Sequence, residues 1–200
     1  MYQPAFVQAL IGYDDNTSVV LSTGARFIRK LPDGRPLGYL HKLFAPLLAP
    51  DLGELYVTLG RDLPSEFEAF LSWANGATLF DNLLFLYGAG GNFSRERELE
   101  DQSALSIIEA NEFLDQDRWE AGWTRVGSVV GWNSKYLIEL HREGECTVLG
   151  EGGGLKSYPS FNTCLQQIVT RLSLCFSCDG PIDQSYSELE AALGSLIYTS

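Results

Sequence analysis

The chain has 200 residues, and 45% of them are hydrophobic, which is enough apolar material for one globular domain with additions. It carries 14 lysines and arginines against 26 aspartates and glutamates, so the formal net charge is −12. This balance argues against nucleic-acid binding, because phosphate contacts need clustered basic side chains. It favours a basic protein partner instead.

No apolar run approaches the roughly 18 residues that a membrane span needs. Residues 1–13 contain no basic side chain and are followed by Asp14 and Asp15, so the charged region of a secretory signal is missing. We therefore expect a cytoplasmic protein without membrane contact.

The first fifty residues predict short elements. Apolar spacing indicates a helix over 4–11, and two short strands are expected at 19–21 and 26–28. Pro32-Asp33-Gly34 predicts a turn, because proline fixes φ and glycine accepts the strained position. Leucines and Phe44 recur at helical spacing over 37–48, which predicts a helix there.

The next segment predicts a helix over 52–59, with Asp51 as its N-cap and Gly60 ending it. A second helix should start at Ser65, whose side chain forms a capping box with Glu68. Its buried face is predicted from apolar residues that follow Leu63 by four, seven, eight and eleven positions. The residues on that face are Leu63, Phe67, Phe70, Leu71 and Ala74.

Asn75-Gly76 ends that helix, because both residues tolerate positive φ. Thr78–Phe80 and Leu83–Tyr87 then form either a hairpin or one interrupted strand. A polar loop over 88–102 follows. A helix is predicted over 103–115, with Leu105, Ile108 and Phe113 as its buried candidates and Glu109 and Glu112 facing outward.

Three strand-like runs, at 124–130, 135–140 and 147–149, are separated by short polar turns. This spacing is typical of an antiparallel meander. Helices are predicted before and after it rather than between its strands. We therefore expect an α+β fold with a mostly antiparallel central sheet flanked by helices.

The last predicted elements are helical. Phe161, Leu165, Ile168 and Leu172 recur at helical spacing. A second capping box, Ser187 with Glu190, predicts a short terminal helix.

The sequence offers no recognisable catalytic or cofactor motif. The glycine-rich run over 150–157 lacks the glycine that a phosphate-binding loop needs before its lysine, so it is interpreted as a flexible connection. Residues 88–91 lack the third spaced glycine of a dinucleotide-binding fingerprint. His41 and His141 stand near no nucleophile motif. We expect no cofactor and no enzymatic activity.

Cysteine usage indicates reduced thiols and no metal site. The four cysteines, Cys146, Cys164, Cys175 and Cys178, permit two disulfides only in an oxidising compartment. A zinc site would need two more ligands beside the Cys175-x-x-Cys178 pair. Cys164 and Cys175 suit the apolar face of a helix, where cysteine packs as a small hydrophobe.

Acidic residues are concentrated between residues 95 and 120, which hold nine of them against three arginines. Two interpretations stay open: a solvated polar face, or a surface that binds a partner. The nearby Trp119, Trp123 and Trp132 belong either to the core or to an exposed groove. The candidate partner-binding residues are Glu96, Glu98, Glu100, Asp101, Asp115 and Asp117.

Several blocks of the chain, in this order, resemble the SUKH superfamily. Leu63-Pro64 opens an acidic and aromatic short helix that ends in Asn75-Gly76 and an apolar strand. Trp119, Val126-Gly127-Ser128, the strand 136–140, Val148-Leu149 and Tyr158-Pro159-Ser160-Phe161 follow. The resemblance covers residues 51–174, leaving 1–50 as an N-terminal extension packed on the domain and 175–200 as a C-terminal loop with a short helix. Its motif residues, which transfer as structural positions only, are Leu63, Pro64, Phe70, Leu71, Asn75 and Gly76.

The SUKH superfamily includes bacterial toxin-immunity proteins of toxin–antitoxin type and the yeast cell-wall synthesis regulator. The resemblance thus implies an immunity protein that binds a toxin, and the acidity favours a basic nuclease as the target. The alternative is an endogenous regulatory or scaffolding module like the yeast branch. A hydrolase using an Asp or Glu pair is a third reading, although the sequence singles out no such pair.

Overall fold

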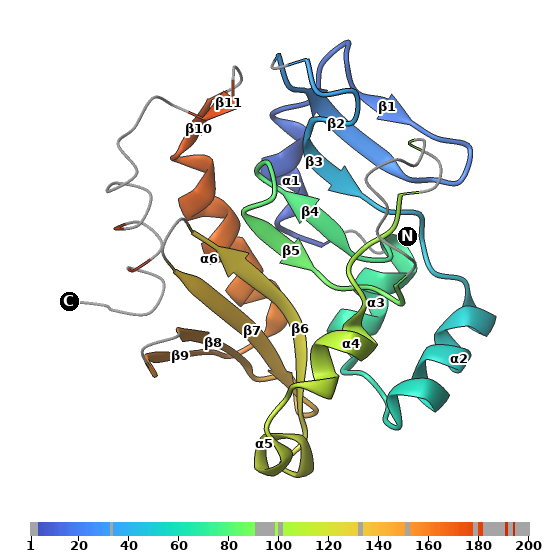
Figure 1. The fold of residues 1–200 in the computed structure, drawn as a ribbon, viewed down its shortest axis with the longest axis vertical. Coiled ribbons are helices and arrows are strands. Elements are labelled where there is room, and N and C mark those ends of the chain that lie inside the picture. The colour runs from blue at the N-terminus through green and yellow to red at the C-terminus, as the bar shows by residue number, and fades with distance from the viewer. Residues whose placement is uncertain are drawn as a thin grey trace.

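The centre of the computed structural model is one antiparallel sheet of nine strands whose order in space follows the chain (Figure 1). The structure describes residues 4–32, 34–90, 99, 102–131, 134–150, 153–177, 180–181, 191 and 194. Helices pack against the sheet within a single domain, so the predicted α+β class is confirmed.

The strands of the large sheet are β1 Val19–Val20, β2 Arg26–Lys30, β3 Tyr39–Leu43, β4 Ala77–Leu79, β5 Leu84–Leu86, β6 Trp123–Val130, β7 Lys135–His141, β8 Cys146–Gly150 and β9 Leu155–Tyr158. A separate pair joins β10 Phe176–Ser177 to β11 Gly180–Pro181. The helices are α1 Val7–Ile11, α2 Ala49–Leu59, α3 Ser65–Trp73, α4 Ile107–Glu112, α5 Gln116–Glu120 and α6 Phe161–Ser173. In the described part of the chain, no helix is both long enough and apolar enough to cross a bilayer.

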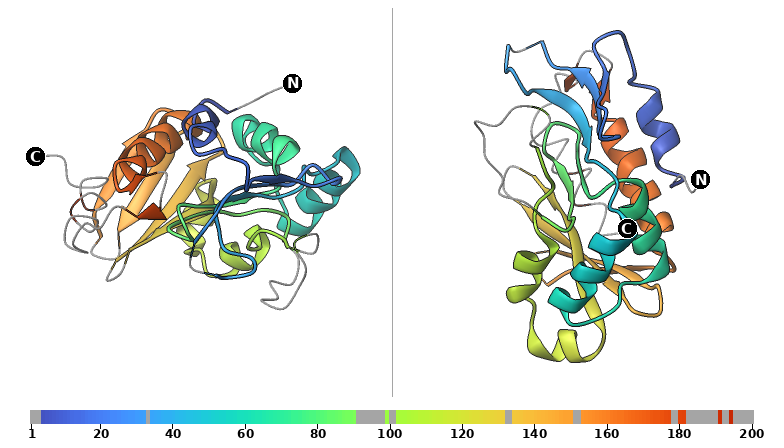
Figure 2. Two further views of the ribbon diagram at one scale, coloured as in Figure 1. Left: turned by 90° about the horizontal axis from the view of Figure 1, so that it is seen from above. Right: turned by 90° about the vertical axis from the view of Figure 1, so that its right-hand side faces the viewer.

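The helices form two layers. Helices α1, α3 and α6 lie side by side on one face of the sheet, whereas α4 and α5 pack against β6 on the other (Figure 2). The first layer is joined by aromatic rings: Phe67 and Phe70 of α3 lie 5.2 and 5.9 Å from Phe161 of α6, centroid to centroid. Phe6, next to α1, lies 6.2 Å from Phe70. All four rings are buried.

The first fifty residues contribute α1 to this core and β1, β2 and β3 to the sheet. The helix predicted over 37–48 is wrong, because residues 39–43 form strand β3 between β2 and β4. Tyr39, Leu40 and His41 are buried in succession, since β3 is covered on both faces. Such a strand lacks polar alternation, and its leucine spacing resembles that of a helix.

The N-caps predicted at Asp51 and Ser65 are also wrong. Helix α3 begins at Ser65 with Pro64 as its N-cap, and the Pro64 carbonyl accepts the amides of Phe67 and Glu68. Helix α2 begins at Ala49, so Asp51 lies in its first turn and is not the N-cap. Its negative charge there interacts favourably with the positive end of the helix dipole. The predicted end of α2 at Gly60 is confirmed, with φ of 78°.

Several later predictions are settled by the sheet. The meander of β6, β7 and β8 is confirmed, as is helix α6, with Ser160 capping the Thr163 amide. Strands β4 and β5 form a hairpin rather than one interrupted strand. The connection over 150–157 is not simply flexible, because Leu155–Tyr158 pairs with β8 as strand β9. The capping box at Ser187 and Glu190 lies outside the described residues.

Cys146 and Cys164 are buried thiols that pack between β8 and α6. A hydrogen bond to Cys164, and secondly burial, raise the pKa of Cys146 well above its ordinary value. Cys146 therefore stays protonated and behaves as a small hydrophobe. Cys178 lies outside the described residues.

The β4–β5 hairpin turns through three consecutive residues in the left-handed region, Phe80, Asp81 and Asn82, with φ of 53°, 50° and 72°. Aspartate and asparagine tolerate this region, but phenylalanine does not. The Phe80 amide is held by the imidazole Nδ1 of His41, 3.2 Å away. The buried His41 thus stabilises an unfavourable turn.

The Asn75-Gly76 pair before this hairpin is built into close backbone packing. Gly76 has φ of 83°, and a Cβ there would clash with the Ala104 side chain and lie 2.7 Å from the Leu86 carbonyl oxygen. The Asn75 side chain accepts the Ala89 amide at 2.7 Å. Both residues therefore take part in close backbone packing at this turn.

We expect Gly76→Ala to lower the free energy of unfolding by at least about 3 kcal/mol, because left-handed strain adds to a steric clash. The matched control is Gly60→Ala. Gly60 has nearly the same φ but open space around its Cβ position, so only the strain remains, about 1 kcal/mol. Urea unfolding of both variants measures the difference, and equal losses would contradict the packing described for Gly76.

His41 makes stability depend on pH. Burial lowers the pKa of His41 to about 3 from an ordinary 6.5, and protonation would remove the acceptor of the Phe80 amide. Below pH 6.5 the unfolded chain takes up a proton that the folded protein does not, so stability falls as the pH drops. The loss reaches about 2 kcal/mol at pH 5.

His41→Asn keeps an acceptor oxygen near the Nδ1 position but removes the titration. Urea unfolding at pH 7.5 and pH 5 should show that the natural protein loses about 2 kcal/mol more than the variant between these pH values. The same loss in both proteins would show that His41 contributes nothing to the acid sensitivity.

Candidate partner-binding surface

The predicted partner-binding residues fall in two places. Glu96, Glu98, Glu100 and Asp101 lie outside the described residues and stay predictions. Asp115 and Asp117 are exposed at the start of α5. The structure therefore describes only the α5 part of the predicted patch.

Helices α4 and α5 present a surface that is both acidic and partly apolar, here called the acidic helical surface. Its carboxylates are all exposed: Glu109, Glu112, Asp115, Asp117 and Glu120. Phe113 lies between the two helices and is 80% exposed. The expectation that Phe113 is buried is wrong, because Ile107 takes the inward position of α4 instead. Glu109 and Glu112 face outward as predicted.

The acidic helical surface is fixed to the sheet by a buried carboxylate. Glu139 of β7 is 2% exposed and accepts a 2.7 Å hydrogen bond from Nε of Arg118, the inward-facing cation of α5. Its other oxygen accepts from Arg125 of β6 at 3.3 Å. Charge-assisted bonds of this kind are stronger than neutral ones, so they hold α5 in one place.

This network follows the register of the sheet. Arg125 pairs with Glu139 across β6 and β7, and Glu139 pairs with Thr147 across β7 and β8. The three side chains therefore line one row on the face that α5 covers, because side chains alternate along a strand. Arg118 also reaches the Thr147 hydroxyl at 3.3 Å and lies 4.2 Å from the Trp123 ring centroid.

Helix α4 is anchored by Asn111. Its Oδ1 accepts the Arg125 amide at 2.8 Å, and its Nδ2 donates to the Arg125 carbonyl at 2.9 Å. This pair of bonds imitates a strand partner for β6. Ser106 caps the helix by accepting the Glu109 amide. The exposed side of α4 is thereby presented on a fixed backbone.

Trp119 and Trp123, near this surface, are half-buried. This is intermediate between the two alternatives that the sequence left open, a place in the core and a place in an exposed groove. Arg61 stacks on Trp119, with its guanidinium carbon 3.2 Å from the ring centroid. Trp123 is covered by Arg118 and by His141, whose ring lies 5.0 Å away. Trp132 lies outside the described residues. Both described rings pack against cations at the rim of the sheet.

Asp115 has a structural task that the sequence analysis missed. It is the N-cap of α5, and its carboxylate accepts the amides of Asp117 and Arg118 at 3.0 and 3.3 Å. Asp117, the other member of the predicted pair on α5, is exposed and stays a predicted contact residue. The four apolar motif residues, Leu63, Pro64, Phe70 and Leu71, are buried.

Sequence reasoning missed the arginines and the acid that build this surface. Glu139 was visible as a single acid inside the apolar strand 136–140, which signals a buried partner. Arg118 stood out as a cation among acids. The cross-strand neighbour Arg125 gave no such signal, because its register depends on tertiary pairing.

The histidines and the metal-ligating side chains of the described part of the chain do not form a metal-binding cluster at this surface. No group of three or more His, Cys, Asp and Glu side chains there is arranged to hold a metal ion. Of the two histidines, His41 is buried in the core, and His141 contacts the Ala121 carbonyl at 2.9 Å. What the arrangement can do is hold exposed carboxylates at fixed positions.

Comparison with known proteins found no match, either to a family model or to a curated protein.

We expect Glu139→Gln to destabilise the fold by about 3 kcal/mol, because it leaves two arginines without their buried counter-charge. The control, Asp81→Asn, makes the same change in the more exposed ion pair with Arg35. Asparagine tolerates the left-handed backbone of Asp81, so we expect a loss below about 1 kcal/mol. Denaturant unfolding at neutral pH compares the two, and losses of equal size would argue against a structural role for the buried network.

Proposed function

We propose that this protein is a non-enzymatic immunity protein that neutralises a basic protein toxin by binding over its active site in the cytoplasm. The observation that carries the proposal is the acidic helical surface of α4 and α5. A nuclease with a phosphate-binding cleft is the expected target, since its cationic site is complementary to exposed carboxylates.

The resemblance to the SUKH superfamily supports this proposal. The Leu63-Pro64 pair opens α3, which ends at Trp73 with Ala74 as its C-cap, and Asn75-Gly76 follows with positive φ at Gly76. The blocks at 126–128, 136–140 and 148–149 lie on the adjacent strands β6, β7 and β8. These blocks thus belong to one sheet and to helix α3, while Trp119 lies on α5 and residues 158–161 join β9 to α6.

The geometry of the surface suits rapid and stable protein binding. Its carboxylates would steer a basic partner toward it, which raises the association rate in a salt-dependent way. Phe113 supplies an apolar anchor at the centre of the charges, where interface energy is usually concentrated. Because Glu139 and Asn111 already fix the two helices, little ordering entropy would be lost on binding.

The first experiment is affinity capture of the tagged protein from its native cells, washed at low and then at high salt. A single basic, toxin-like protein should be retained, and its expression should be lethal unless this chain is co-expressed. Recovery of cell-envelope or signalling factors instead, with no protection, would favour the regulatory module over the immunity protein.

With the captured toxin, Glu112→Lys combined with Asp117→Lys should slow association by about tenfold at low salt, and the effect should shrink as salt rises. Asp115 is left unchanged because it caps α5. Stopped-flow binding measures the rates, and unfolding curves verify that the variant is folded.

The matched control combines Asp14→Lys with Glu54→Lys, which makes the same change in net charge at exposed positions outside the acidic helical surface. It should leave the association rate within about twofold. Equal slowing by both double variants would mean that overall charge, rather than this surface, directs binding.

A further inference from the structure

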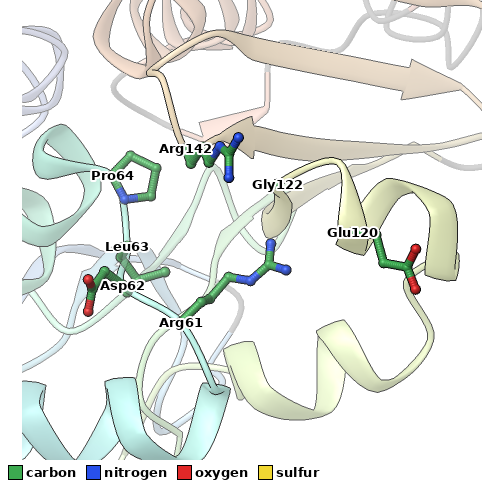
Figure 3. A pocket seen from close by; sticks show the side chains of 7 residues that line it. All are labelled: Arg61, Asp62, Leu63, Pro64, Glu120, Gly122 and Arg142. Carbon is green, nitrogen blue, oxygen red and sulfur yellow. The ribbon is translucent and has the colours of Figure 1, made fainter.

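A pocket of about 360 Å³ lies between the approach to α3, the end of α5 and the β7–β8 turn (Figure 3). Its walls include Leu63 and Pro64, and two arginines extend into it, Arg61 and Arg142. These two residues are far apart in the sequence and come from different elements. Two converging cations are unusual in a chain with a net charge of −12.

Arg61 is held rigidly. Its two terminal nitrogens donate to the carbonyls of Trp119 and Trp123 at 2.6 and 2.9 Å, and its plane stacks on the Trp119 ring. A guanidinium has five N–H groups, so these two bonds leave donors unused. Burial, and secondly the charge of Arg142, lower the pKa of Arg61 below its ordinary value.

Arg142 is placed beside it by the backbone. Its amide donates to the Gly122 carbonyl at 3.0 Å, and its side chain lies over Gly122, where an added Cβ would come within 3.0 Å of the arginine Cδ. Gly122 thus makes room for the arginine. Among the described residues, no carboxylate forms an ion pair with the Arg142 guanidinium.

The two acids at the pocket do not neutralise this pair. In Figure 3 the guanidinium groups of Arg61 and Arg142 point toward one another, whereas the carboxylates of Asp62 and Glu120 point away. Glu120 is occupied, because its Oε1 accepts the side-chain amide of Gln116 at 2.8 Å. The space between the guanidinium groups is therefore positive and offers unused donors.

We propose that this pocket binds a carboxylate group, which would lie between Arg61 and Arg142. The fork of guanidinium donors matches the two oxygens of a carboxylate, and the apolar wall of Leu63 and Pro64 accommodates the short aliphatic stem of a small acid or an acidic side chain. A volume of about 360 Å³ is at the small end for ligand pockets and has room for a small acid or a single acidic side chain.

A carboxylate suits the site better than phosphate does. Asp62 and Glu120 remain at the rim, and their charges penalise a dianion more than a monoanion. The pocket shares Glu120 with the acidic helical surface, but it selects a ligand of the opposite charge, so this inference does not rest on the proposed function.

The test is an NMR titration of the full-length ¹⁵N-labelled protein, following the arginine Nε–H signals at constant ionic strength. Two probes carry a carboxylate: sodium acetate, and the blocked tripeptide acetyl-Gly-Glu-Gly-amide. The matched peptide with Gln in place of Glu, and inorganic phosphate, serve as comparison probes. We expect saturable shifts at Arg61 and Arg142 with both carboxylates, and none with the Gln peptide. Tighter binding of the Glu peptide than of acetate would assign the carboxylate to a protein segment, and the reverse would assign it to a free acid.

Arg142→Gln should weaken carboxylate binding at least about tenfold, whereas the same change at the exposed Arg26, on the distant strand β2, should leave it unchanged (Figure 1). Arg142 is exposed, so an unchanged unfolding midpoint is expected and confirms that the variant is folded. No saturable shift, binding that survives Arg142→Gln, or tighter binding of phosphate than of either carboxylate would each overturn the proposal.

Discussion

The cluster of phenylalanine rings between α1, α3 and α6 is the contact on which the rest of the fold depends. Phe6, Phe70 and Phe161 come from the beginning, middle and end of the chain. The Phe70 ring centroid lies 6.2 Å from that of Phe6 and 5.9 Å from that of Phe161. Strands β4 and β5 have only three residues each, so they bury little surface by themselves. The aromatic layer covers them and joins the N-terminal strands to the C-terminal meander.

On the opposite face of the sheet, polar and charged interactions hold the covering helices in place. The central contact there is the carboxylate of Glu139, shared by Arg118 and Arg125, which fixes α5 by charge-assisted bonds. Helix α4 is anchored separately, by Asn111 and by the buried Ile107. A buried ion network adds little net stability, but it defines one geometry. The aromatic layer therefore closes one face of the sheet, while the other face presents charged side chains at fixed positions.

Local pattern was sufficient where an element is amphipathic along one face. Helix α6 follows from its helical periodicity, and the meander β6–β8 follows from strand-like runs separated by short polar turns. Strand β3 was misread as a helix, because both of its faces are covered and alternation disappears. Ser65 was misread as a cap because the capping-box pattern does not reveal whether the preceding Pro64 already starts the helix. At the candidate surface, acidity and Asp117 were visible in sequence, but the cap role of Asp115 and the exposure of Phe113 were not.

The sequence by itself determined the α+β class, the buried face of α3, the left-handed turn at Gly76 and the excess of negative charge. These properties depend on residues within a few positions of each other or on composition alone. Only the tertiary structure decided that Arg125, Glu139 and Thr147 form one row, and that Arg61 and Arg142 share a pocket. Such contacts between residues distant in sequence depend on strand register and on the geometry of the turns. Both are selected by many long-range interactions acting together.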